Sequence, residues 1–163
     1  LGLSVSTELP AFSEIENVFL RESLRPWGVL RKFNYKGSVH DLSFKSPLKK
    51  LPELAAAVSA AARAAGYAPE DVGGYFTIIE RGRAIHCEFD LHCGADDGER
   101  EKVCKLWQDA SSMLQYKGAL FDRPYGYWAG MVYAKAPHYF SKLKQLKKEM
   151  DPQGILNPGK LGL

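Results

Sequence analysis

Cysteine is scarce, charge is almost balanced, and no long hydrophobic run occurs in these 163 residues. Three cysteines are an odd and low count, which does not fit a disulfide framework and favours a reducing, cytoplasmic setting. A net charge of +3 is too small to indicate nucleic-acid binding. No apolar run approaches the ~20 residues of a membrane span, and no signal-peptide pattern is present.

Apolar residues are plentiful by contrast, at 45% of the chain, and aromatic residues make up 12%. This is enough for a packed core, and the length predicts one domain covering residues 1–163. The chain begins at Leu1 instead of Met, so we expect a processed chain or part of a longer one.

Hydrophobic periodicity predicts an alternation of helices and strands. We expect strands at residues 29–35, 39–45, 74–80 and 83–91, with a short strand at 119–121, and helices at 13–25, 46–66, 97–117 and 137–150. An aromatic loop is expected over residues 123–133. The order from residue 40 to residue 121 predicts an α+β fold with a ferredoxin-like antiparallel sheet. Both helices should cover one face of this sheet and leave the other face free.

The segment "GRAIHCEFDLHC", residues 82–93, concentrates histidine, cysteine and carboxylate side chains. Strand alternation sends Cys87 and Cys93 to the apolar face as small buried hydrophobic residues, and His86 and Glu88 to the other face. A two-residue turn at Arg81 and Gly82 predicts a hairpin. It would place two further polar side chains on that face by pairing Tyr75 with Glu88 and Thr77 with His86. This cluster fits either a solvated surface or the wall of a substrate pocket.

A metal site is the weaker interpretation of the same strand. His86, Glu88 and His92 are known ligand types on one face. However, His86 and His92 lie about 20 Å apart along a strand that rises ~3.3 Å per residue. Both histidines cannot reach one ion from a regular strand, so we expect no metal; His86 with Glu88 and one outside ligand remains the alternative.

Two later segments carry a family resemblance. The tail "LKKEMDPQGILNPGKLGL", a helix followed by an Asn-Pro-Gly-Lys turn, resembles the C-terminus of FAD-linked oxidases of the vanillyl-alcohol oxidase / p-cresol methylhydroxylase superfamily. The strand "GRAIHCEFDL" and the loop "RPYG" resemble the 4-cresol-dehydrogenase-like and glycolate-oxidase-like members. The resemblance spans roughly residues 70–163. It implies a C-terminal cap that carries substrate-binding residues over the flavin of a separate FAD-binding domain.

The resemblance also implies roles for individual residues. His86, Glu88 and Tyr125 would be catalytic, with His86 or Glu88 as the proton acceptor. Arg123 would hold a carboxylate or phenolate, because a guanidinium suits a planar anion. The other substrate-binding residues would be Tyr75, Thr77, Tyr127 and Trp128, although Tyr127 and Trp128 also suit packing. Asn157, Gly159 and Lys160 would approach the FAD.

The predicted function is therefore that of a substrate-binding cap in an FAD-dependent oxidoreductase. The aromatic residues favour a phenolic or other aromatic substrate that gives up hydride to the flavin. The alternatives are part of a glycolate/D-lactate-type 2-hydroxy-acid dehydrogenase and a non-enzymatic ferredoxin-like module that binds a ligand or a partner chain. No glycine-rich phosphate loop is present, so the FAD-binding domain should lie upstream or on a separate chain, and the isolated chain should be inactive. An electron-acceptor protein and a homodimer remain open as partners.

Overall fold

Three antiparallel strands form the centre of the protein in a computed structural model that describes residues 14–25 and 31–163. The strands are β1 (Ser38–Ser46), β2 (Val72–Ile79) and β3 (Ala84–Cys93), and their order in the sheet is β1-β3-β2. The strand expected at 119–121 is reduced to a single bridge between Lys45 and Leu120, at the outer edge of β1. The predicted α+β class is confirmed, with one strand of the ferredoxin-like order shortened to this bridge.

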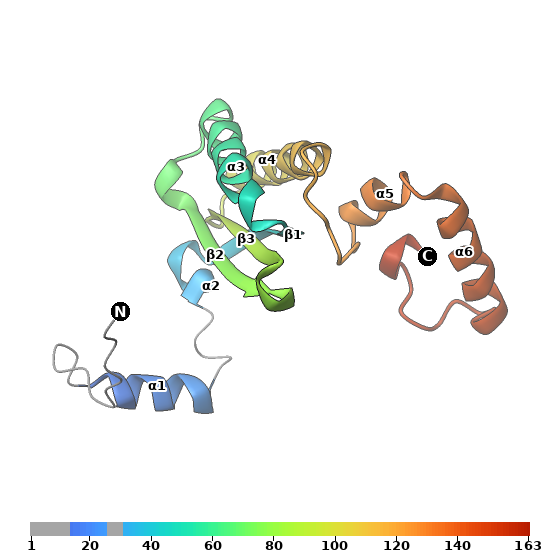
Figure 1. The fold of residues 1–163 in the computed structure, drawn as a ribbon, viewed down its shortest axis with the longest axis horizontal. Helices are drawn as coiled ribbons and strands as arrows, with labels where there is room; N and C mark the ends of the chain where they lie inside the picture. Colours follow the sequence, from blue (N-terminus) through green and yellow to red (C-terminus); the bar gives the residue numbers. More distant parts are fainter. Residues whose placement is uncertain (1–13, 26–30) are drawn as a thin grey trace.

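Two long helices, α3 (Leu51–Ala64) and α4 (Asp97–Tyr116), cover one face of the sheet (Figure 1). The side chain of Asp96 caps α4 by accepting a hydrogen bond of 2.8 Å from the backbone N–H of Glu99. Gly66 follows α3 and Gly118 follows α4, and both have the positive φ that ends a helix. Both helices therefore end, and α4 begins, close to the positions that the sequence predicts. α3 begins at Leu51, five residues later than expected, because Ser46 still belongs to β1.

The core lies between these helices and the sheet. Its fully buried side chains come from alternate positions of β1 and β3 and from one stripe of each helix, and include Leu42, Phe44, Cys87, Leu91, Leu54, Val58, Val103 and Leu114. Cys87 and Cys93 are free and buried among them, as predicted. Burial raises the pKa of the Cys87 thiol to about 11, so this side chain behaves as a small hydrophobic residue.

The hairpin between β2 and β3 has the predicted register. Tyr75 is paired with Glu88 and Thr77 with His86. Its turn is the short 3-10 segment η4 (Glu80–Gly82), in which Arg81 and Gly82 both have positive φ. Two other short 3-10 segments connect elements of the sheet and helix layer: η2 (Leu48–Lys50) and η3 (Pro69–Asp71).

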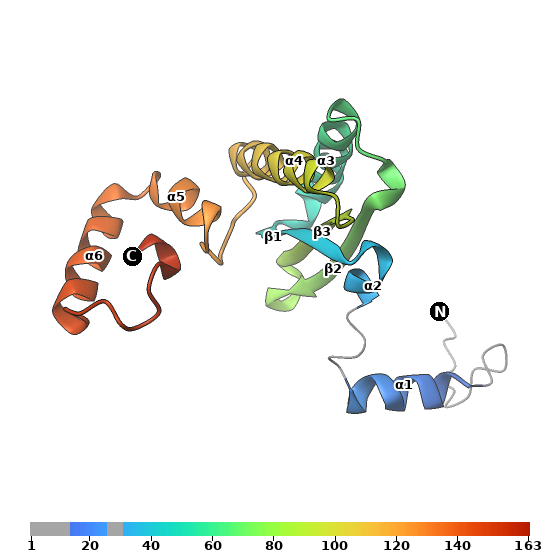
Figure 2. The ribbon, with the colours of Figure 1, turned by 180° about the vertical axis from the view of Figure 1, so that it is seen from behind.

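A short helix, α2 (Arg31–Lys36), lies on the face of the sheet opposite α3 and α4 (Figures 1 and 2). The strand predicted at 29–35 is therefore wrong over residues 31–35, and residues 29 and 30 lie outside the described part. The expectation that this face is free is wrong for the end that α2 covers. Lys32 and Lys36 are one helical turn apart and both bind carboxylates of the sheet region, whereas in an extended segment they would lie about 13 Å apart.

The C-terminal lobe, residues 127–163, is joined to the sheet by the segment that follows α4 (Figure 1). It contains α5 (Tyr127–Tyr133), α6 (Pro137–Met150) and the 3-10 segment η5 (Lys160–Gly162). Residues 127–133 were predicted as part of a loop. They form a helix instead, because Trp128 and Tyr133 turn inward and are buried. At the other end of the chain, α1 (Ile15–Leu24) buries none of its residues.

The described residues contain no helix that is both long and apolar enough to cross a bilayer.

Candidate functional site

The face of the sheet opposite α3 and α4 carries polar side chains in cross-strand rows. Three residues of β3 on this face have a neighbour on both sides. Glu88 lies between Tyr75 and Ser43, and His86 lies between Thr77 and Lys45 in the next row. A third row contains Gly73, Asp90 and Asp41. We call these residues, together with Lys32 above them, the polar face.

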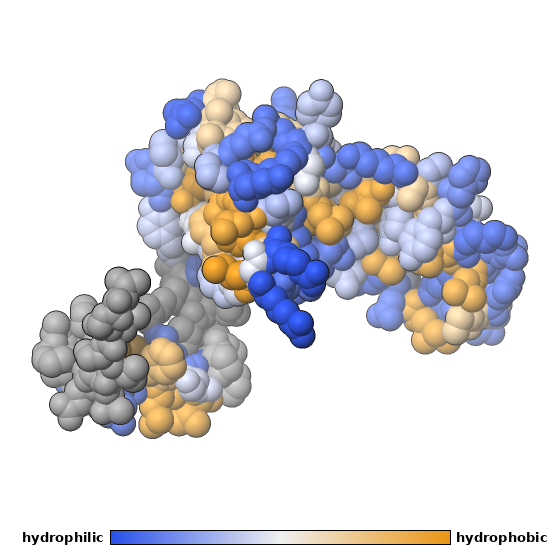
Figure 3. Space-filling view, in the orientation of Figure 1, coloured by the Kyte–Doolittle hydropathy of each residue, from blue (hydrophilic) through white to orange (hydrophobic). Residues whose placement is uncertain are grey.

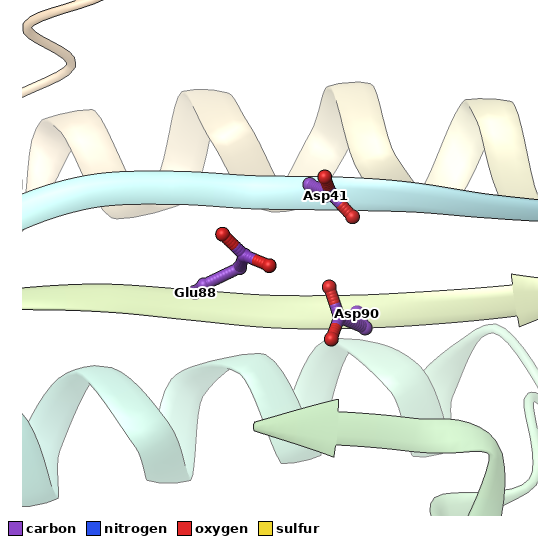
Figure 4. A group of neighbouring side chains, drawn as sticks. All are labelled: Asp41, Glu88 and Asp90. Carbon is purple, nitrogen blue, oxygen red and sulfur yellow. The ribbon is translucent and has the colours of Figure 1, made fainter. Parts of the chain in front are cut away.

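A lysine from α2 is the centre of charge on this face. The Nζ of Lys32 lies 2.7 Å from Oε1 of Glu88, 2.8 Å from Oδ2 of Asp41 and 3.8 Å from Oδ1 of Asp90. Figure 4 shows the three carboxylates converging between β1 and β3. One ammonium therefore faces three carboxylates.

The pKa values follow from this imbalance. Burial lowers the pKa of Lys32, but the hydrogen bonds to Asp41 and Glu88 outweigh burial and raise it. Burial and the neighbouring Asp41 carboxylate raise the pKa of Asp90 to about 7, against the opposing effect of Lys32. Asp41 and Asp90 are directly paired across the strands, where two like charges are unfavourable. Near neutral pH, Asp90 is therefore partly protonated.

Three carboxylates at one point also meet the distance requirement of a metal site. One oxygen each from Asp41, Glu88 and Asp90 can be chosen so that all lie within 4.8 Å of one another. Lys32 already places one positive charge among these oxygens and binds both Glu88 and Asp41, so its ammonium occupies the position that an ion would take between them. Neither His86 nor His92 belongs to this group, the only one of its kind within residues 14–25 and 31–163.

The predicted proton acceptors His86 and Glu88 lie next to Tyr75 and Thr77. Nε2 of His86 is 3.9 Å from Oε2 of Glu88, the oxygen that does not bind Lys32. The rings of Tyr75 and His86 meet edge to face at a centroid distance of 6.4 Å. All four side chains come from the β2–β3 hairpin, and His86 and Glu88 are only partly buried. A ligand lying on this part of the sheet could therefore reach both groups.

The loop that carries Arg123 and Tyr125 leaves the sheet at the outer edge of β1. Asp122 forms an ion pair of 2.9 Å with Lys45, which is the neighbour of His86 in its row. The loop thus begins beside the polar face. Arg123 and Tyr125 are exposed, and Tyr125 also lines the pocket of the C-terminal lobe.

The other two aromatic candidates contact the helix layer. The indole of Trp128 is buried against Trp107 and Phe121, and its Nε1 donates a hydrogen bond of 2.9 Å to Oγ of Ser111. The hydroxyl of Tyr127 lies 2.9 Å from Oγ of Ser112. These contacts attach α5 to α4, which is the packing role that the sequence left open for both residues.

A pocket of about 670 Å³ opens in the C-terminal lobe between α6 and the tail. Its lining is mostly apolar, and its polar contributors include Asn157 and Lys160. The Nζ of Lys160 lies 6.0 Å from the ring centroid of Tyr125. Gly159 adjoins the pocket at a positive φ of 73°, in a turn that starts with Asn157, also at positive φ. The three residues expected to approach FAD are thus adjacent at one pocket.

Asp151 fixes the tail that forms this pocket. Its two carboxylate oxygens accept hydrogen bonds from the backbone N–H groups of Ile155 and Leu156, at 3.0 and 2.9 Å. Lys147 binds both Asp151 and the carbonyl oxygen of Leu156. The hydrogen bond from Lys147, with further help from the two backbone donors, holds the pKa of Asp151 below its usual range. The "DPQGILNP" motif is therefore a turn closed by its own aspartate.

The structure groups the candidate residues into two sets. His86, Glu88, Tyr75 and Thr77 lie together on the polar face, whereas Tyr125, Asn157 and Lys160 line the pocket of the lobe. Sequence reasoning missed Lys32, Asp41 and Lys45 as neighbours of the first set, whereas strand alternation already places Asp90 on the face of His86 and Glu88. Polar and apolar residues alternate along β1, and this pattern could have placed the polar ones on the same face as His86: Asp41, Ser43 and Lys45 alternate with Leu42 and Phe44. No comparable signal pointed to Lys32.

Comparison with known protein families adds one finding. The family model described as FAD linked oxidases, C-terminal domain, matches residues 127–161, which are α5, α6 and most of the tail. No curated protein and no solved structure matches the chain. The match supports a C-terminal domain of an FAD-linked oxidase, and with it the context of a flavin-dependent oxidoreductase.

Proposed function

We propose that this chain is the substrate-side domain of an FAD-dependent oxidoreductase, and that its polar face forms one wall of the substrate pocket. The match of residues 127–161 to the C-terminal domain of FAD linked oxidases carries this proposal. The FAD-binding part would be supplied by another domain or chain. FAD, when bound there, would accept a hydride from a carbon of the substrate.

The residues around the lobe pocket suit a contact with FAD. Lys160 offers a positive charge and Asn157 an amide beside an apolar surface, which fits a flat cofactor that carries phosphates. Gly159 allows close approach of the backbone because no side chain projects there, and no heavy atom lies within 4 Å of where its Cβ would be. These three residues would hold the cofactor side of the interface.

The polar face would supply the proton chemistry. One oxygen of Glu88 is paired with Lys32, and its second oxygen faces His86. His86 or Glu88 would take the proton that a phenol or alcohol releases when hydride leaves. Tyr75 and Thr77 would donate hydrogen bonds to the substrate oxygen, and Arg123 would bind a phenolate or carboxylate. Tyr125 would assist from the loop, and Tyr127 and Trp128 would shape the pocket wall. We propose a phenolic or other aromatic substrate, with a cytoplasmic location.

The test is anaerobic reduction of the flavin in the flavoprotein that contains this chain together with its FAD-binding part. Phenols and aromatic alcohols form one set of substrates, and 2-hydroxy acids form the other. We expect the first set to bleach the flavin absorbance. His86→Gln and Glu88→Gln should slow this step by roughly 10²- to 10⁴-fold, and Arg123→Ala should weaken binding of aromatic anions.

The matched control is His138→Gln, the same replacement at an exposed position of α6. It should leave the rate unchanged. Bleaching by 2-hydroxy acids alone would reassign the substrate class. A preparation that binds no FAD would contradict the proposed function. Rates for both His86→Gln and Glu88→Gln equal to that of His138→Gln would remove the polar face from the site.

A further inference from the structure

The two outer edges of the sheet differ in whether another segment of the described chain pairs with them. The outer edge of β1 is covered by the segment after α4, through two backbone hydrogen bonds between Lys45 and Leu120 of 2.8 and 2.9 Å. The ion pair of Lys45 with Asp122 adds charge at the same edge. The outer edge of β2 has no such cover, since none of the residues that the structure describes pairs with it. Its outward backbone N–H and C=O groups remain available.

β2 also lacks the features that protect exposed strand edges. Its sequence, VGGYFTII, has no charged residue and no proline, and its pairing with β3 is continuous from Val72 to Ile79 without a bulge. Tyr75, Phe76 and Ile78 are 57%, 42% and 66% exposed. Figure 3 shows apolar side chains gathered along β2. Natural proteins avoid such an edge unless another strand pairs with it.

We propose that β2 pairs antiparallel with β2 of a second copy of this chain, around a two-fold axis at Phe76. Residues that face each other in an antiparallel pair lie on the same face of the sheet, so a strand that pairs with itself must align residues of equal parity. Alignment at Phe76 places Gly74 opposite Ile78 of the second copy, and Tyr75 opposite Thr77. A residue without a side chain thus faces a large one on the helix side, while two polar residues meet on the polar face.

Charge favours the same register. Arg81 of the hairpin comes level with Asp71 of the second copy. Asp71 is buried and paired with Lys36, so the acidic side chain available at this level is the neighbouring, exposed Glu70. Arg83 is also exposed at this end of the hairpin. Arg81 and Arg83, which outnumber Glu80 at the hairpin end of β2, therefore come near the exposed Glu70 at the other end, twice in the dimer. The uncharged strand between them opposes no like charges.

The pairing creates one sheet of six strands from two sheets of three. Because the two-fold axis is perpendicular to the sheet, both helix layers lie on the same side of it. Phe76 and Ile78 of the two copies fill the gap between these layers. The two polar faces lie together on the opposite side.

The proposal is tested by the mass of the 163-residue chain in solution, measured by light scattering and sedimentation equilibrium over a range of micromolar concentrations. We expect a dimer of about 36 kDa, twice the mass of 18.2 kDa. Ile78→Lys should weaken association by roughly tenfold or more without changing the fold, because it adds a charge to an exposed position of the edge. Leu120→Lys, a matched change at an exposed position of the covered edge, should leave the dimer intact.

Cysteine cross-linking tests the register. Phe76→Cys places two thiols directly opposite each other at the axis, where they can form a disulfide on oxidation. Ile78→Cys faces Gly74 and should cross-link far less. A monomer at all concentrations, a dimer insensitive to Ile78→Lys, or equal cross-linking at 76 and 78 would each overturn the proposal. None of these measurements involves flavin, so their failure leaves the proposed function untouched.

Discussion

The sheet with its two long helices and the C-terminal lobe bury very different shares of their apolar side chains. In the first region, alternate residues of β1 and β3 and whole helix stripes are inaccessible to water. In the lobe, α6 has no buried residue, and Leu146, Met150, Ile155 and Leu156 are at least half exposed. The first region can be stable by its own core, whereas the lobe presents an apolar surface of the kind that a partner covers.

This difference bears on the proposed function. The match to FAD linked oxidases lies in the lobe, at residues 127–161, while the titratable side chains lie on the polar face of the sheet. The two regions are connected through Trp128, which belongs to α5 but packs in the core of the sheet region. We infer that the lobe docks onto the FAD-binding part and that the sheet then presents its polar face to the substrate.

The largest expected effect is a loss of stability caused by a substitution in the core of the sheet region. Phe44 is fully buried and stacks on Phe89 at a centroid distance of 6.1 Å, so Phe44→Ala should lower the free energy of unfolding by about 3–5 kcal/mol. Leu146→Ala, on the exposed surface of the lobe, should change it by less than about 1 kcal/mol. Urea unfolding followed by circular dichroism measures both. Equal costs for the two variants would contradict the contrast between the regions.

A smaller effect should depend on pH and come from the polar face. The pKa of Asp90 is raised in the folded protein to about 7, so folding favours its protonated form. The folded state gains stability from Asp90 below the unfolded pKa of ~3.9, and loses it as the pH rises through about 7. Asp90→Asn replaces the titrating carboxyl with a neutral amide, so the variant does not lose this stability as the pH rises. Relative to the unmodified protein, it should therefore gain on the order of 1–2 kcal/mol between pH 5 and pH 8.

Thermal or urea unfolding at a series of pH values measures this difference. Asp109→Asn, on the exposed surface of α4, is the control and should show a difference that does not change with pH. If Asp90→Asn were equally pH-independent, the pairing of Asp90 with Asp41 and Lys32 would be wrong.

The smallest effect should be confined to the tail of the lobe. Asp151→Ala removes the acceptor for the N–H groups of Ile155 and Leu156. Hydrogen exchange at these two amides should accelerate by roughly an order of magnitude, while amides of β1 and β3 keep their protection. Glu149→Ala, two residues earlier on an exposed side of α6, is the control. Faster exchange in β3 after Asp151→Ala would mean that the two regions unfold as one.

Local patterns in the sequence predicted much of the fold. Alternation separated the buried Cys87 from the polar His86, and the Arg81-Gly82 turn fixed the register that brings Thr77 next to His86. Helix boundaries followed from Asp96, Gly66 and Gly118. Such features depend on residues that are close in the chain, which is why a single sequence contains them.

The predictions that were wrong concern segments whose structure depends on contacts with distant parts of the chain. Residues 31–35 have the alternating apolar pattern of a strand, yet they form a helix because Lys32 and Lys36 bind carboxylates on β1, β3 and η3. The aromatic segment 127–133 is helical because Trp128 packs against α4. Propensity over six or seven residues is weak, and tertiary contacts override it.

The sequence by itself therefore determined the helix layer, the hairpin and its register, and the segregation of titratable from apolar side chains. Only the tertiary structure decided that Lys32 lies among Asp41, Glu88 and Asp90, and that Asp122 reaches Lys45. It also decided that one edge of the sheet is covered while the outer edge of β2 pairs with none of the described residues. The physical reason is the range of the interactions. Hydrophobic periodicity and turn geometry depend on residues that are close in the chain. Each of these ion pairs and sheet edges depends instead on segments that meet only after the sheet has formed.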